Sequence, residues 1–309
     1  MSTLLNIGTS GMVAQSKKMT TIGNNLANTQ TPAFKAASLQ FSDTFYRIGT
    51  STAAGHVSQE GHGTNIGGTN FNWNAGGMQR TDKETHIAVS GRKGMIPVKH
   101  KDETMYSRAG DFSFARDDSG DIVLARPNGA QLMVEDDSGG LAKLTFSEVP
   151  SSIRIASDGK ITIPTPTMTD PDGDGTDQPA GPGILAGGIG SPDIDTTGDG
   201  TLDGHSQAQI KLQAFGNPDT LIHRSNGLLS TTDKTIKSGD GIQDGDGTVP
   251  VKPGEHGTGS LQQGYLEESN VDLVKEFSDM IATQRAYQAN SRSIRTADDL
   301  LKEALSLKR

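Results

Sequence analysis

The fold is decided first by residues 271–307, VDLVKEFSDMIATQRAYQANSRSIRTADDLLKEALSL. Apolar side chains recur there largely at helical spacing, with strong helix formers between them. These side chains are Phe277, Met280, Ile281, Tyr287, Ile294, Leu301 and Leu305. The stretch therefore predicts a long amphipathic α-helix near the C-terminus.

Polar residues at both ends of this stretch support the prediction. Ser269 or Asn270 can cap the helix, and Asp272 and Glu276 suit its positive N-terminal end. Basic side chains suit the negative C-terminal end, and they are Lys302, Lys308 and Arg309. The local signals for this helix agree with one another.

The N-terminal segment, residues 4–28, carries a second apolar stripe. Its members lie seven residues apart, with one more in a second row, and they are Leu5, Met12, Met19, Leu26 and Ile22. Gly8, Gly11 and Gly23 interrupt the segment, and a glycine inside a helix costs up to about 1 kcal/mol relative to alanine. We expect a helix here that is marginal unless it packs against a partner.

The chain between the two helices reads as short strands separated by Gly, Asn and Asp turns. The predicted fold class is therefore α+β: a discontinuous, coiled-coil-like helical base built from both termini, and a β-rich central domain with a polar Gly/Asp-rich insert. The expected boundaries are 1–30 with 270–309 for the helical base, 31–75 with 257–269 for a connector, 76–163 with 205–256 for the β-rich domain, and 164–204 for the insert.

Composition excludes several classes of function. The chain has 309 residues, of which 32% are hydrophobic and 39 are glycine, so we expect modest cores and many turns. Its net charge of −9 argues against nucleic-acid binding. No cysteine is present for disulfide or thiol chemistry, and no stretch resembles a signal peptide or a membrane span of about 20 apolar residues.

The insert offers one candidate for metal binding. Asp170, Asp172 and Asp174 reproduce the first three ligand positions of a helix-loop-helix calcium loop. Position twelve is Gly181 rather than glutamate, so a solvated polar loop is the favoured interpretation. The seven histidines are scattered and no nucleophile or phosphate-loop pattern is present, so we expect neither a cofactor nor an enzyme.

Sequence motifs at both ends resemble those of flagellar rod and hook proteins. They are IGNNLAN at 22–28 and TPAFK at 31–35, then GYLEESNVDL at 264–273 and QRAYQAN at 284–290. The centre is similar as well, with IAVSGRKG at 87–94 and YSRAGDF at 106–112. Met95 and Ile96 depart from the resemblance because the family usually has two aromatic residues there.

The resemblance implies a structural subunit whose terminal helices pack between subunits as the inner tube of a helical assembly. The residues expected at that interface are Leu5, Met12, Met19, Ile22, Asn24, Asn25, Leu26, Asn28, Phe277, Met280, Ile281, Gln284, Arg285, Tyr287, Asn290, Ile294, Leu301 and Leu305. Two simpler alternatives remain: a helix hairpin inside a monomer, and an asparagine-rich helix C-terminus.

The resemblance also implies a place and partners for the subunit. Within the family, a short hook protein is favoured and a distal-rod protein is the alternative. The partners would be further copies, the distal rod, the hook cap, hook–filament junction proteins and the flagellar type III export apparatus, which would carry the chain out of the cell. Phe41 and Phe45 match an export-gate recognition element, although two nearby aromatics can also cap a strand or form a small core cluster.

Overall fold

The computed structural model describes residues 2–51, 57–101, 103–117, 119–135, 141–146, 149–150, 152–163, 208–215, 217–231 and 250–307. The chain forms two compact units, each described by itself. The terminal unit comprises Met1–Thr31, Lys35–Asn72 and Ser269–Arg309. The central unit comprises Pro32–Phe34 and Trp73–Glu268. The predicted insert and its candidate calcium ligands Asp170, Asp172 and Asp174 lie outside the described residues.

Two α-helices occur among the described residues, α1 (Ser2–Ala27) and α3 (Leu273–Ser306). Asp272 caps α3, because its Oδ1 accepts hydrogen bonds from the backbone N–H of Val274 and of Lys275. The prediction that Ser269 or Asn270 caps this helix was therefore wrong. Asn270 is not available as a cap, since its amide bonds the backbone of Ala36 and of Asn72.

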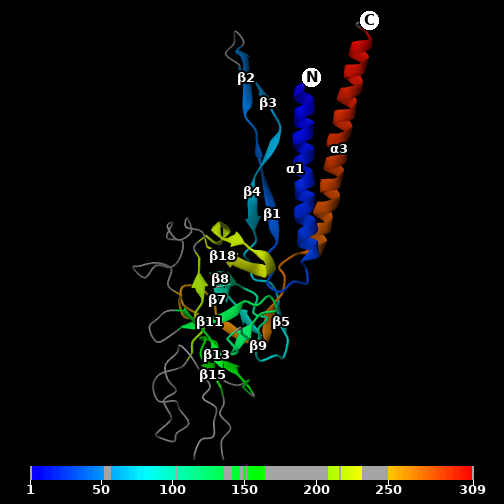
Figure 1. Cartoon of the computed structure of the whole chain (residues 1–309). Coiled ribbons are helices and arrows are strands. Elements are labelled where there is room, and N and C mark those ends of the chain that lie inside the picture. The colour runs from blue at the N-terminus through cyan, green and yellow to red at the C-terminus, as the bar shows by residue number, and fades with distance from the viewer. Residues whose placement is uncertain are drawn as a thin grey trace, which may run out of the picture. The chain divides into compact units, whose positions relative to one another are not determined.

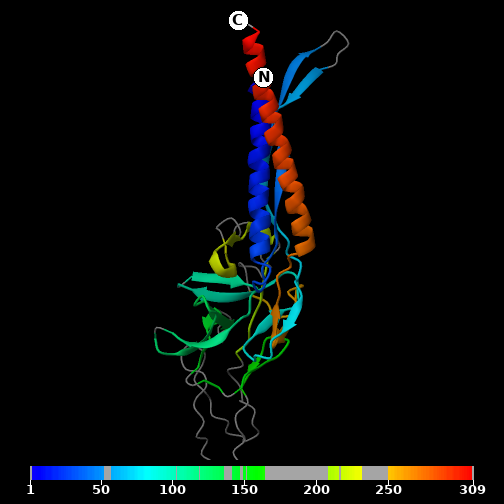
Figure 2. The ribbon, with the colours of Figure 1, turned by 90° about the vertical axis from the view of Figure 1, so that its right-hand side faces the viewer.

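The two helices lie side by side and run antiparallel (Figures 1 and 2). Glycines of α1 stand against side chains of α3. A Cβ on Gly8 would lie 2.7 Å from Ile294 Cγ1, and a Cβ on Gly11 would lie 2.6 Å from Asn290 Nδ2. The glycines that weaken the helix locally therefore allow the two backbones to approach closely.

A β-ladder packs beside α1 in the terminal unit (Figure 1). It pairs β1 (Ala37–Asp43) with β4 (Thr64–Phe71), and a second pair joins β2 (Tyr46–Ser51) to β3 (Val57–Gly61). Gly63, just before β4, has φ +103, and a Cβ there would lie 2.2 Å from Ser10 Oγ of α1. Only glycine fits this contact between the ladder and the helix.

Among its described residues, the central unit is built around a ten-stranded antiparallel sheet in the order β13-β10-β11-β7-β8-β18-β17, with β9, β12 and β16 pairing beside that path. Its strands are β7 (Gly94–His100), β8 (Glu103–Ser107), β9 (Ser113–Arg116), β10 (Ile122–Ala125), β11 (Gln131–Glu135), β12 (Leu141–Lys143), β13 (Thr145–Phe146), β16 (Gln213–Ala214), β17 (Ile222–His223) and β18 (Leu228–Ser230).

Three smaller antiparallel pairs and two 3-10 turns complete the described part of the central unit. The pairs are β5 (Met78–Arg80) with β20 (Tyr265–Glu267), β6 (Ile87–Val89) with β19 (Leu261–Gln263), and β14 (Arg154–Ile155) with β15 (Ile161–Thr162). The turns are η1 (Pro218–Thr220) and η2 (Ser225–Gly227). Two of the pairs join residues before 90 to residues after 260, so the unit closes only when both parts of the chain are present.

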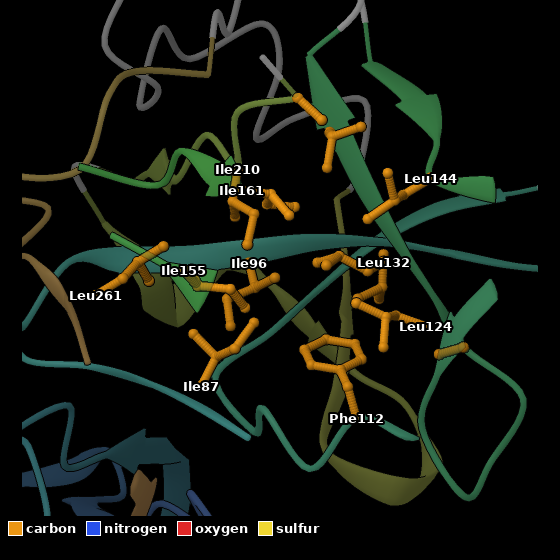
Figure 3. Packing of buried hydrophobic residues seen from close by; sticks show 14 of the residues in the cluster. Ile87, Ile96, Phe112, Leu124, Leu132, Leu144, Ile155, Ile161, Ile210 and Leu261 are labelled. Carbon is orange, nitrogen blue, oxygen red and sulfur yellow. The ribbon is translucent and has the colours of Figure 1, made fainter. Parts of the chain in front are cut away.

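Figure 3 shows residues of the main apolar core, to which β7 contributes Ile96 and Val98. Ile96, Leu124 and Leu132 contribute to it, and the ring of Phe112 points into the cluster. Met95, the next residue of β7, belongs instead to a second cluster with Tyr106, Phe215, Leu221 and Leu229. Met95 and Ile96 are both fully buried, and they serve different clusters because successive side chains of a strand point to opposite faces. β7 is one of the short strands that the sequence predicts between the two helices.

The α+β class is confirmed, since two helices accompany a β-rich body. The coiled-coil-like nature of the base, the boundaries proposed for four parts and the Gly/Asp-rich insert stay predictions. The terminal unit is discontinuous in sequence because its two helices come from opposite ends of the chain. They pack together because each needs the apolar surface of the other.

Candidate assembly surface of the terminal helices

The structure sorts the eighteen predicted interface residues by their exposure. Buried residues are Ile22 and Asn25, at 4% and 1% exposure. Half-buried residues are Leu5, Met12, Met19, Leu26, Asn28, Met280, Asn290, Ile294 and Leu301. Exposed residues are Asn24, Phe277, Ile281, Gln284, Arg285, Tyr287 and Leu305. The exposed set is the part that a second molecule can reach directly.

Exposed apolar side chains gather at the N-terminal end of α3. Val274, Phe277 and Ile281 follow one another at i, i+3 and i+7, which places them on one face, and they are 77%, 54% and 53% exposed. Val274 was missed in the sequence analysis, although its spacing from Phe277 and Ile281 was the signal that could have identified it. A row of exposed apolar residues of this kind is a candidate surface for a partner.

Asn25 lies inside the terminal unit rather than on its surface. Its Nδ2 donates to Ala37 O at 2.8 Å and to Glu276 Oε1 at 3.0 Å, and its Oδ1 accepts from Ala37 N at 3.0 Å. The amide thereby joins the end of α1, the start of β1 and the first turn of α3. Because these partners occupy it within the chain, we do not carry Asn25 forward as an interface residue.

Asn28 and Asn24 close the C-terminal end of α1. Asn28 Nδ2 donates to Asn24 O at 2.9 Å and to Asn24 Oδ1 at 3.2 Å, and Asn28 Oδ1 accepts from Thr31 Oγ1 at 3.0 Å. This geometry fits the helix-terminus alternative. Neither Asn24 nor Asn28 has a positive φ, so neither residue adopts the left-handed conformation that often ends a helix.

Glu276 is the titratable group at this junction. Burial raises the pKa of Glu276 above its ordinary value; the hydrogen bond from Asn25 opposes the change, and nearby Asp279 adds to it. Lys275 lowers the pKa and Asp272 raises it. The amide of Asn25 thus stabilises a carboxylate that burial alone would disfavour.

A buried ion pair in the central unit was also missed in the sequence analysis. Arg108 Nε donates to Glu267 Oε2 at 2.9 Å, with the side chains 3% and 0% exposed. Arg108 also donates to the carbonyls of Gly94, Val89 and Gly91. The partners are 159 residues apart, so no local pattern could have paired them. The pair fixes the chain two residues before the terminal unit resumes at Ser269.

Phe41 and Phe45 do not form a core cluster. Phe41 pairs in register with Ile66 across the β1–β4 ladder and is 40% exposed, whereas Phe45 is 96% exposed. The alternative that both aromatics are core residues is therefore wrong for Phe45. Their role as an export-recognition element stays a prediction.

No group of three or more acidic or histidine side chains among the described residues is arranged to hold a metal ion. Of the helices in the described ranges, neither has the length and hydropathy needed to cross a bilayer.

Two protein-family models match the ends of the chain, where these helices lie. Residues 5–35 match the family described as "Flagella basal body rod protein", and residues 262–307 match "Flagellar basal body rod FlgEFG protein C-terminal". These two matches cover α1 and α3 almost entirely.

Similar proteins include the flagellar basal-body rod proteins FlgG of Bacillus subtilis (strain 168) and of Borreliella burgdorferi (strain ATCC 35210 / DSM 4680 / CIP 102532 / B31). The first is 31% identical over 98% of this chain and 97% of its own length, and the second is 30% identical over 97% and 96%. The flagellar hook protein FlgE of Caulobacter vibrioides (strain ATCC 19089 / CIP 103742 / CB 15) is 39% identical over 33% of this chain and 16% of its own length. The chain is a structural protein rather than an enzyme, and it belongs to the family of flagellar rod and hook proteins.

Proposed function

We propose that this chain is a distal-rod subunit of the flagellar basal body. The observation that carries the proposal is full-length similarity: rod proteins match 97–98% of the chain, whereas the hook protein matches 33%. The hook assignment favoured in the sequence analysis is thereby the weaker of the two. A rod subunit and a hook subunit share terminal motifs, so the end motifs alone did not separate them.

The terminal unit supports polymerisation in this proposal. The outer face of α3 presents Val274, Phe277 and Ile281 to solvent, while its opposite side packs against α1 through Asn290 and Ile294. An apolar row left exposed in the monomer gains stability when a second copy covers it, at roughly 25 cal/mol per Å² of apolar area. Head-to-tail repetition of one such contact builds a helical polymer without closing it.

Partners and location follow from the same proposal. Further copies of this chain are the first partner, and the neighbouring axial proteins, including the hook, are the next. The hook cap and hook–filament junction proteins are partners only if the hook alternative holds. Phe41 and Phe45, both exposed, are available to the type III export apparatus before assembly. The subunit would then act outside the cytoplasmic membrane, in the basal body.

Electron microscopy of hook–basal bodies from cells lacking this chain tests the proposal. We expect a truncated rod without a hook, restored when the chain is expressed again. A complete rod that lacks only its hook would establish the hook alternative instead. An unchanged flagellum would contradict both assignments.

A further inference from the structure

The C-terminal end of α3 extends past the N-terminal end of α1 (Figures 1 and 2). α3 has 34 residues and α1 has 26, and the two helices run antiparallel with Gly8 opposite Ile294. Because α1 begins at Ser2 and both helices rise equally per residue, the position opposite that first residue lies near Leu300. Residues 301–307 of the chain, which we call the overhang, therefore have no described part of α1 beside them.

The face of α3 that meets α1 continues into the overhang. Ile294 and Ala297 lie on this face, and Leu301 and Leu305 follow them at helical spacing. Ala297 is 2% exposed, whereas Leu305 is 68% exposed. The exposure differs because α1 runs beside the first part of the face and not beside the second. An apolar face that is covered along the helix pair thus stays open over about two turns at its end.

A second open apolar surface lies at the other end of α3. It is the outer row, Val274, Phe277 and Ile281, which helical spacing places on the side turned away from Ile294 and α1. The outer row spans about two turns, as the overhang does, so each surface can cover the other along its full length. About 27 residues, or ~40 Å of helix, separate the two surfaces, so they cannot meet within one copy.

Charge also favours a contact between these two ends. Residues 271–281, around the outer row, carry three acidic side chains and one basic one. Residues 301–309, the overhang and the two residues after it, carry three basic side chains and one acidic one. Lys302 is bonded to Asp298 and Asp299, which precede the overhang, but all three side chains are more than half exposed, where such pairs contribute little. The two ends of α3 therefore attract one another between copies.

We propose that Leu301 and Leu305 of one copy pack against the outer row of the next copy, with the two α3 helices parallel. α3 of the second copy then takes the place beside the overhang that α1 holds along the rest of the helix. The inference rests on the proposed function and deepens it, because it names the contact that joins one rod subunit to the next. Since the two surfaces lie at opposite ends of one helix, the contact repeats head to tail without closing, at a spacing of about 40 Å along α3.

Crosslinking of introduced thiols tests this contact in the full chain, which has no cysteine of its own. Ser278→Cys borders the outer row and Ala304→Cys lies in the overhang, and both positions are exposed, so the apolar residues of the contact stay intact. The assembled double variant is treated with a short bismaleimide and separated under denaturing conditions. The two thiols of one copy are about 40 Å apart, so the linker joins them only between copies. We expect a ladder of covalent multimers.

The control chain combines Ala304→Cys with Val149→Cys, at an exposed residue of the central unit. Sedimentation establishes that polymers have formed before the crosslinker is added. Polymers that give no ladder from the 278–304 pair, or an equal ladder from the control pair, would overturn the contact and leave the proposed function standing. An unsubstituted chain that never polymerises would overturn both.

Two substitutions at one position give an independent measurement. Leu305→Lys and Leu305→Glu remove the same apolar contact and have similar helix propensities, but they bring opposite charges to the acidic end of the partner's α3. Leu305→Glu should raise the critical concentration for assembly about tenfold or more, and Leu305→Lys should raise it less. The difference should shrink at high salt, and circular dichroism checks that both variants keep α3. Equal critical concentrations, or tighter assembly of the glutamate variant, would contradict the proposal.

Discussion

The side-chain amide of Asn25 pairs with the backbone of Ala37 on both sides, donating to its carbonyl at 2.8 Å and accepting from its N–H at 3.0 Å. Two hydrogen bonds of this kind imitate a step of a β-ladder. The same Nδ2 reaches Glu276 at 3.0 Å. One buried side chain thereby fixes where the last turn of α1, the first residue of β1 and the first turn of α3 meet.

Asn25→Ala should destabilise the terminal unit by about 1–3 kcal/mol, because the N–H and carbonyl of Ala37 lose their partner in a buried place. Urea unfolding followed by far-UV circular dichroism checks this, since helical signal from the described residues comes mainly from α1 and α3. Asn24→Ala is the matched control: Asn24 is exposed, and its substitution should change stability by less than about 0.5 kcal/mol. Similar losses for both variants would contradict the role given to Asn25.

Arg108→Ala should destabilise the central unit by about 3–5 kcal/mol, since Glu267, at 0% side-chain exposure, would lose its cationic partner. Fluorescence of Trp73, the chain's single tryptophan, reports unfolding of this unit. The control is Arg80→Ala, which removes an ion pair with Asp82 whose side chains are 71% and 73% exposed. We expect Arg80→Ala to leave the midpoint of unfolding unchanged. If it shifted the midpoint as much as Arg108→Ala does, burial of the ion pair would not be the cause of the destabilisation.

Replacing a glycine of α1 by alanine should change the stability of the protein in a direction that depends on which atoms surround the glycine. Gly23 has no atom within 4 Å of a built Cβ, so Gly23→Ala should stabilise α1 by about 0.5–1 kcal/mol. Gly8→Ala gains the same helix propensity but places a Cβ 2.7 Å from Ile294 Cγ1, so it should be the less stable variant. Thermal unfolding of the two variants side by side checks the order. The reverse order would contradict the close approach of α1 and α3.

The stability of the central unit should fall as the pH drops below about 6.5, in part because of His223. Burial lowers the pKa of His223 in the folded state, against the opposite effect of Asp219. The unfolded chain then binds more protons between that lowered value and 6.5, so protonation favours unfolding in this window. His86, whose pKa burial also lowers, contributes in the same direction.

His223→Gln should flatten this pH dependence. Trp73 lies 5.7 Å from the His223 ring, so its fluorescence during urea unfolding at pH 5, 6, 7 and 8 measures the effect at the right place. At pH 8 the histidine is neutral in both states, so the difference between variant and parent at pH 8 gives the pH-independent cost of the substitution. A slope between pH 5 and 7 that equals the parent's would rule out the contribution of His223.

The outer face of α3 should matter for assembly and not for folding. Phe277→Ser with Ile281→Ser should abolish or strongly weaken polymerisation, because both side chains are more than half exposed in the single chain and gain burial only against a partner. Sedimentation measures the polymer, and circular dichroism checks that α3 persists. Ile222→Ser, at an exposed apolar residue of the central unit, is the control. Normal polymers from the double variant would contradict the assembly surface.

The sequence by itself determined the two terminal helices, since apolar residues at three-, four- and seven-residue spacing define a helix face whatever the rest of the chain does. It likewise determined the β-rich centre, because strands such as β7 and β10 are short apolar runs bounded by turn residues. The end motifs identified the family. They could not separate rod from hook, which required similarity along the whole chain.

Tertiary structure decided which side chains those helices bury and which they expose. Asn25 and Asn24 are neighbours of the same type, yet one is buried against Ala37 and Glu276 while the other is exposed, because β1 and α3 cover only one side of α1 there. Asp272 rather than Asn270 caps α3 because Asn270 is taken by Ala36 and Asn72, the latter 198 residues away. Two residues so far apart in sequence can form a hydrogen bond only after folding has brought them together. The local sequence pattern around each residue therefore carries no information about the bond.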